Sequence, residues 1–240
     1  MNITMHRHDG HMDMLVRYAS ELFDEALIRR FLEQLSHTLS WMSDSPDATI
    51  AQVRLLPPSQ AEMVRQFSRN AQRCIFDKRG GLVPVGVTGW VADTSGLLGS
   101  PAKWDEQGRL VRQNNDLHRV QANIGQETLP PAMPEKHPDS PVGRVQIEPS
   151  MDPSELAVFC DAKNISLLTL LSVAFGYTLA IYANAEEALF SLLFNTQPEG
   201  GPKLLKAASV SLPMESGKTT EELLQAVHGQ LVSSVESNGL

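Results

Sequence analysis

The sequence predicts an α/β fold of the α+β type, in which helices pack against a mixed sheet. Apolar and polar residues alternate in short segments at both ends of the chain, which is typical of half-buried strands. A strongly amphipathic helical pattern runs from Leu27 to Met42, and the last third alternates strand-like and helix-like segments. With 240 residues, 42% of them apolar, the chain can bury the core of one large domain or two small ones.

The composition of the chain argues against a nucleic-acid-binding protein and against a secreted one. The formal net charge is −8 and no long run of one sign occurs, so a general nucleic-acid binder with a basic stripe is not expected. The two cysteines, Cys74 and Cys160, form no CxxC pair, which favours a reduced, cytoplasmic protein. The first residues lack the apolar segment of a secretory signal, so none is expected.

One segment has the length of a membrane span. Residues 165–185 carry no charge and are mostly apolar. Several hydroxyl groups dilute this hydrophobicity, and neither a basic cluster nor a tryptophan belt flanks the segment. We therefore expect a helix buried in the protein rather than in a membrane.

The first quarter predicts a hairpin and a helix. Apolar residues alternate on either side of Asp9-Gly10, a favoured turn pair, so residues 1–20 are expected to form two paired strands. Asp24 has the position of an N-cap for the amphipathic helix that follows. The alternating residues of the hairpin are Ile3, Met5, Met14, Val16 and Tyr18.

The middle of the chain predicts a short helix over 59–69, strands within 73–92, and a hairpin that turns at residues 106–108. Residues 128–141 hold five prolines in fourteen positions, which is typical of a linker.

The last third predicts a strand over 143–149 and a helix that starts at Asp152-Pro153, a cap followed by proline. The long apolar helix follows. Strands are expected over 189–195 and 207–212, and Thr219 is expected to cap a final helix that ends near Val235.

Residues 12–58 resemble the end of a condensation domain of nonribosomal peptide synthetases. In that family a strand with a tyrosine, a Leu-Phe-Asp turn, a long helix, a Pro-Asp loop and a Leu-Leu pair follow one another. The chain has Tyr18, Leu22-Phe23-Asp24, Pro46-Asp47 and Leu55-Leu56 in the same order.

Residues 72–125 resemble a shortened adenylation domain. Residues 83–89 match the Val-Pro-x-Gly-Val-x-Gly turn of that family, with Trp90 where glutamate is usual. The Thr-Gly-Asp motif, whose Asp holds the ribose of ATP, is absent, as are the phosphate loop and the C-terminal lysine. Asp116 is the only counterpart offered for the hinge residue. The resemblance therefore implies that this chain does not adenylate amino acids.

Residues 142–236 resemble the start of the second lobe of a condensation domain, which has a chloramphenicol-acetyltransferase-like fold. The two condensation-like pieces thus come from one lobe in reversed order, and in the family their strands share a sheet. The resemblance implies four parts: 1–60 and 142–240, which pack together, a β-rich segment at 68–127, and the linker 128–141. It also implies that the strands within 1–20 join those at 189–195 and 207–212, either within one chain or by strand exchange in a homodimer.

Candidate catalytic and metal-binding residues are few. The stretch His6-Arg7-His8-Asp9-Gly10 lacks the adjacent histidines of the condensation motif and is interpreted as a hairpin turn. His6, His8 and His11 lack a fourth zinc ligand, and Ser216-Gly217-Lys218-Thr219 lacks the first glycine of a phosphate loop. We assign no catalytic, cofactor-binding or metal-binding residue. The three tryptophans, Trp41, Trp90 and Trp104, are interpreted as packing residues.

Three hypotheses for function stay open. In the first, the chain is a synthetase-like protein without a catalytic centre that contacts carrier, condensation or adenylation domains, or a tailoring enzyme, in the biosynthesis of a peptide natural product. In the second, it is part of an amide-forming condensation enzyme whose His motif another chain supplies. In the third, it is a free-standing small-molecule binding protein. None of them requires a cofactor, nucleic acid or a membrane.

Overall fold

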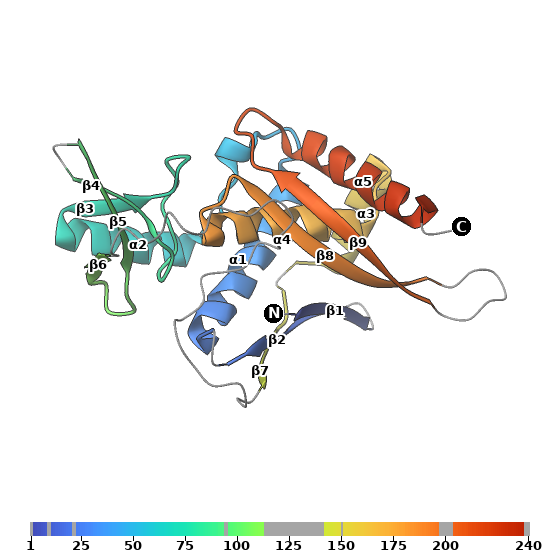
Figure 1. Ribbon diagram of the computed structural model, residues 1–240, viewed down its shortest axis with the longest axis horizontal. Coiled ribbons are helices and arrows are strands. Elements are labelled where there is room, and N and C mark those ends of the chain that lie inside the picture. Colours follow the sequence, from blue (N-terminus) through green and yellow to red (C-terminus); the bar gives the residue numbers. More distant parts are fainter. Residues whose placement is uncertain are drawn as a thin grey trace.

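Five α-helices and three small antiparallel sheets make up the described part of the chain (Figure 1). The computed structural model describes residues 2–8, 11–20, 23–93, 96–112, 142–149, 151–196 and 204–237. The helices are α1 (Glu25–Asp44), α2 (Pro58–Ala71), α3 (Pro153–Lys163), α4 (Leu167–Ala183) and α5 (Thr220–Ser237), with a short 3-10 helix at Ile50–Gln52.

The first sheet has the order β1 (Asn2–His8), β2 (His11–Ala19), β7 (Val142–Ile147). The second has the order β3 (Arg73–Phe76), β4 (Gly89–Asp93), β5 (Gly96–Trp104), β6 (Leu110–Arg112), and the third pairs β8 (Glu187–Thr196) with β9 (Leu204–Pro213). The predicted α+β class is confirmed, but the predicted mixed sheet is wrong for the described strands. Most neighbouring strands here follow one another in sequence, and short connections give antiparallel pairs.

Strands β1 and β2 pair antiparallel as predicted for the hairpin, and β2 also pairs with β7. In this ladder Val16 lies opposite Val145 and Tyr18 opposite Gly143. The pairing of the chain's start with the 142–240 segment therefore closes within one chain. The turn residues Asp9 and Gly10 lie outside the described residues.

The expectation that this hairpin shares a sheet with β8 and β9 is wrong for the strands that the structure describes. Strand β2 pairs with β1 and β7, and β8 and β9 form a separate two-stranded sheet. The backbone of Ser211 in β9 is held instead by helix α5: Ser211 N–H donates to Gln230 Oε1 at 3.0 Å, and Gln230 Nε2 donates to Ser211 O at 2.9 Å. The side-chain amide thus takes the place of a neighbouring strand at this point of the edge.

Local capping signals locate the helices. The Asp24 carboxylate accepts a hydrogen bond from Ala26 N at 2.8 Å, and Asp152 accepts one from Ser154 N at 2.8 Å. Helices α3 and α4 end at Asn164 and Asn184, both in the left-handed conformation. These ends agree with the predicted helices to within a few residues.

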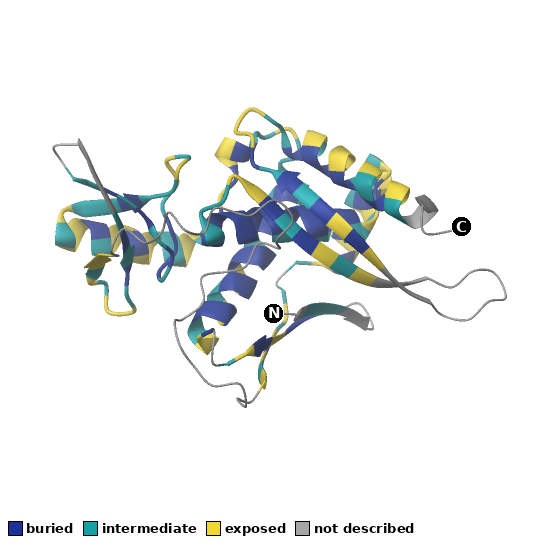
Figure 2. Cartoon of the chain, viewed as in Figure 1, coloured by how far each residue is buried: buried dark blue, intermediate teal, exposed yellow. Residues whose placement is uncertain are grey.

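Helix α4 is buried along most of its length, as predicted for residues 165–185 (Figure 2). It contacts α1, α3, α5, β8 and β9. Within the described residues no single helix has the length and hydropathy of a membrane span. The bent pair α3 and α4, at 102° to each other, meets that test only when both are taken together.

The segment 83–88, expected as a strand, forms a turn instead. Val87 N–H donates to Pro84 O at 3.1 Å, and Gly86 has a φ of 84°. Proline has no N–H to give to a sheet ladder, and the positive φ reverses the chain. Strand β4 therefore begins only at Gly89.

Residues 1–60 and 142–240 meet at several places. Phe31 of α1 makes edge contacts with Phe175 and Tyr182 of α4, with ring centroids 6.0 and 5.0 Å apart. The loop after α1 is hydrogen-bonded to the start of α5 through Ile50 N to Lys218 O at 2.9 Å, and Thr220 N to Ala48 O at 2.9 Å. The β2–β7 ladder is a further contact between them.

We expect Gly143→Ala to lower stability. A Cβ at Gly143 would lie 2.7 and 2.8 Å from the Cε atoms of the Tyr18 ring, which covers this glycine across the β2–β7 ladder. Such a clash in a packed sheet costs roughly 1–3 kcal/mol of unfolding free energy. The matched control is Gly229→Ala in α5, where nothing lies within 4 Å and alanine should add about 0.5–1 kcal/mol. Urea denaturation measures both, and equal stability of the two variants would contradict this ladder.

Candidate functional site

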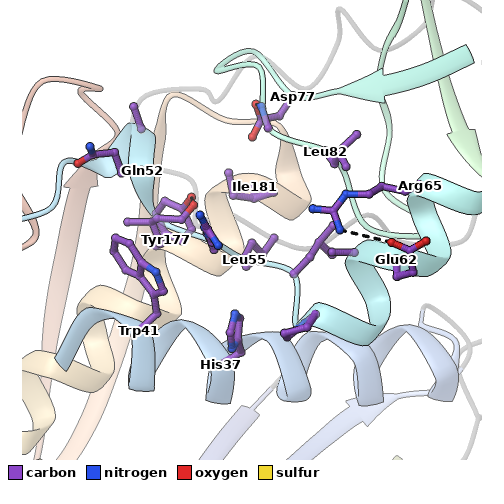
Figure 3. A pocket seen from close by; sticks show the side chains of 17 residues that line it. His37, Trp41, Gln52, Leu55, Glu62, Arg65, Asp77, Leu82, Tyr177 and Ile181 are labelled. Carbon is purple, nitrogen blue, oxygen red and sulfur yellow. Dashed lines mark hydrogen bonds and ion pairs between the residues drawn. The ribbon is translucent and has the colours of Figure 1, made fainter. Parts of the chain in front are cut away.

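An open groove of about 680 Å³ lies where helices α1 and α4 meet the start of the middle segment, α2 and the turn at 77–82 (Figure 3). Its walls come from the second half of α1, the 51–58 connection, the start of α2, the turn at 77–82, and one face of α4. Segments far apart in sequence thus contribute to one hollow.

The floor of the groove is apolar and well anchored. Leu55, Tyr177 and Ile181 are buried, and Leu82 closes one side (Figure 3). The Tyr177 hydroxyl donates to Val53 O at 3.2 Å, which fixes the 51–58 connection against α4. Burial raises the pKa of Tyr177, so this hydroxyl stays protonated and continues to donate.

One rim of the groove carries hydrogen-bond donors that have no partner among the described residues. His37 and Trp41 lie four residues apart on α1, hence on the same side of the helix, and Arg54 comes from the connection beside them. Within the described residues, the side chains of these three make no hydrogen bond or ion pair. Burial, and next the positive charge of Arg54, lower the pKa of His37, so its imidazole is neutral at pH 7.

The acidic groups of the groove are already paired. Glu62 lies 3.6 Å from Arg65 (Figure 3) and 2.5 Å from Arg69. Asp77 Oδ1 accepts from Arg79 N at 2.8 Å and from Gly81 N at 2.9 Å. Of the arginines that line the groove, Arg54 therefore has no counter-ion within the described part of the chain.

A buried polar stripe runs along α1 next to the groove. Arg30, Gln34 and Thr38 follow one another at intervals of four residues, and Gln34 and Thr38 are fully buried. Arg30 holds Glu106 of the β5–β6 turn at 2.7 Å, and Gln34 Nε2 donates to Gln60 Oε1 of α2 at 2.6 Å. Four buried atoms on or beside this stripe have no hydrogen-bond partner in the described structure: Arg30 Nε, Gln34 Oε1, Thr38 Oγ1 and Tyr182 Oη.

The candidate metal-binding histidines His6, His8 and His11 are not among the described residues that line the groove. His8 pairs in register with His11, and His6 with Asp13, but the side chains of the three histidines lie outside the described residues. Asp116 and the 128–141 linker also lie outside them. No group of three or more metal-ligating side chains occurs in the described part of the chain.

The predicted polar turn at 216–219 is confirmed. Lys218 pairs with Glu215 at 2.9 Å, and Thr219 and Glu222 form a capping box through Thr219 N to Glu222 Oε2 at 2.8 Å and Glu222 N to Thr219 Oγ1 at 3.2 Å.

Trp104 is fully buried and packs against Phe67, as expected for a packing residue. Trp41 is only half-buried and lines the groove, which its sequence context did not predict. The spacing of His37 and Trp41 was the available signal, but it gains meaning only once Arg54 folds back beside them.

Replacing Thr38 with valine should raise the unfolding free energy by about 1–2 kcal/mol. The change keeps the side-chain volume nearly constant and removes a buried hydroxyl that has no partner among the described residues. Thr178→Val on α4 is the matched control. Thr178 is equally buried, but its hydroxyl donates to Ala174 O at 2.9 Å, and its loss should cost about 0.5–1.5 kcal/mol. Chemical denaturation distinguishes them, and equal losses in both variants would show that Thr38 is satisfied.

His37 should make folding less favourable at acid pH. Its pKa lies below the ordinary 6.5 in the folded chain, so the unfolded chain takes up the proton first. Stability should therefore fall as the pH drops through 6.5 and below, until folded His37 also titrates. His37→Gln should reduce the loss of stability between neutral and acid pH, whereas His228→Gln on α5, outside the groove, should keep the His37 contribution. Thermal unfolding over this pH range measures it; an unchanged profile in His37→Gln would contradict it.

Comparison with protein-family models, curated proteins and solved structures finds no match to this chain. What the groove accepts is therefore inferred from its own lining residues.

Proposed function

We propose that this chain is a nonribosomal peptide synthetase-like protein that acts through protein contacts rather than through a catalytic centre of its own. Its 1–60 and 142–240 segments together correspond to one chloramphenicol-acetyltransferase-like condensation lobe. The 68–127 segment corresponds to a reduced adenylation domain. The partner is a carrier, condensation or adenylation domain, or a tailoring enzyme, of a peptide biosynthetic system.

One observation carries the proposal: two segments that resemble parts of one lobe, in reversed order, pack together. They share the β2–β7 ladder, the Phe31 contacts with α4, and the hydrogen bonds between the 46–50 loop and the start of α5. Buried apolar side chains from both segments also belong to a single core, which favours their origin in one structural unit.

The middle unit, α2 with β3 to β6, is attached to this body through charged groups as well as through the core. Arg30 binds Glu106, Lys78 lies 3.1 Å from Glu186, and Arg79 Nη2 donates to Ala185 O at 3.2 Å. In this proposal the unit serves to hold and shape the surface beside the lobe, since the sequence lacks the ribose-binding and lysine motifs of adenylation.

The test is recovery of the tagged full-length chain from its native host after mild crosslinking, with peptides identified by mass spectrometry. We expect enrichment of a peptide synthetase or its tailoring enzyme over a tag-only control, with Gly229→Ala behaving like the wild type. The purified chain should show no amino-acid-dependent pyrophosphate exchange above background. Exchange by the purified chain, or enrichment equal to that of the tag alone, would count against the proposal.

A further inference from the structure

We propose that the groove between α1, the 51–58 connection and α4 binds an organic carboxylate with an apolar body, such as an N-acyl amino acid or a medium-chain acyl acid. Arg54 and His37 hold the carboxylate, and the floor around Leu55 and Ile181 takes the apolar part. The inference rests on the groove alone and does not depend on the relation to peptide synthetases.

The rim selects the charge of the ligand. The donor groups of His37, Trp41 and Arg54 have no protein acceptor within the described residues, whereas Glu62 and Asp77 are committed to arginines and backbone N–H groups. A negatively charged ligand with acceptor atoms can accept hydrogen bonds from these donors. A cationic ligand would be repelled by Arg54 and would find no unpaired carboxylate among the described lining residues. A guanidinium pairs well with a carboxylate because both are planar and present two matched contacts.

The small number of unpaired donors on the rim favours a carboxylate over a phosphate as the ligand's charged group. Arg54 is the uncompensated cation of the rim within the described chain, and His37 is neutral beside it. A phosphate monoester, with its higher charge and three terminal oxygens, requires more donors and more positive charge than this rim offers. A singly charged carboxylate matches one guanidinium and one imidazole N–H.

The apolar floor of the groove favours a ligand whose uncharged part is apolar. Leu55, Leu82, Tyr177 and Ile181 line an apolar floor in which Leu82 is the most exposed, and the Tyr177 hydroxyl is already bonded to Val53 O. The volume of about 680 Å³ falls within the range of small-molecule sites. The half-buried Trp41 stands on the same wall as His37, where an aromatic or aliphatic body can contact its ring (Figure 3).

Calorimetry on the full chain tests the proposal with two pairs of probes: N-acetylphenylalanine with its amide, and octanoate with octanamide. We expect at least one acid to bind at least about tenfold more tightly than its amide, since a charge-assisted hydrogen bond is lost in the amide. Arg54→Gln should weaken binding of the acid by about the same factor and leave the amide unchanged. Arg29→Gln on α1, whose partner Glu25 lies outside the groove, should change neither.

Tryptophan fluorescence locates the ligand. Binding of the acid should change the emission of the wild type, and Trp41→Phe should abolish that change while Trp90→Phe retains it. The proposal is overturned if acid and amide bind equally, if Arg54→Gln leaves the acid's affinity unchanged, if inorganic phosphate binds more tightly than the acids, or if none of the four probes binds. Each of these outcomes leaves the synthetase-like proposal untouched, because that proposal concerns the protein partner.

Discussion

Helix α1 packs against helix α4 through Phe31, and most of the molecule depends on this contact. Phe31 is fully buried between Phe175 and Tyr182, and Phe175 in turn meets Phe190 of β8 at 4.9 Å. A chain of edge-on aromatic rings therefore joins the start of the sequence to the last sheet. Truncating a buried phenylalanine of this kind typically costs about 3–5 kcal/mol, a large share of a domain's stability.

The groove is a consequence of the same packing. With α1 and α4 fixed side by side, the 51–58 connection must cross between them, and the Tyr177 hydroxyl holds it there through Val53. This crossing brings Arg54 next to His37 and leaves both without a protein partner in the described structure. His37 and Trp41 on α1 are thus close in sequence to Arg54, with only one loop between them. Their positions relative to Arg54 nevertheless depend on the Tyr177 hydroxyl of α4.

Sequence patterns predicted the features that local chemistry decides. Asp24, Asp152 and Thr219 cap the helices where their side chains suggested, because a cap needs only the next few N–H groups. At Gly86 the apolar neighbours predicted a strand, whereas the motif over residues 83–89 predicted the turn that is observed. The partner of β2 and the lining of the groove were beyond local reasoning, since each depends on which distant segments the core brings together.

The distances along the chain between partners also determine how this protein must fold. The bond from Tyr177 to Val53 spans 124 positions, and that from Thr220 to Ala48 spans 172. Forming contacts of such long range costs loop-closure entropy before the contacts stabilise the chain. Proteins rich in them therefore fold slowly. On the ribosome, the first hairpin and α1 emerge long before β7 and α4 exist. Their apolar faces stay exposed to solvent until those later segments are synthesised. This protein is therefore most prone to aggregate, and most in need of a chaperone, during its synthesis.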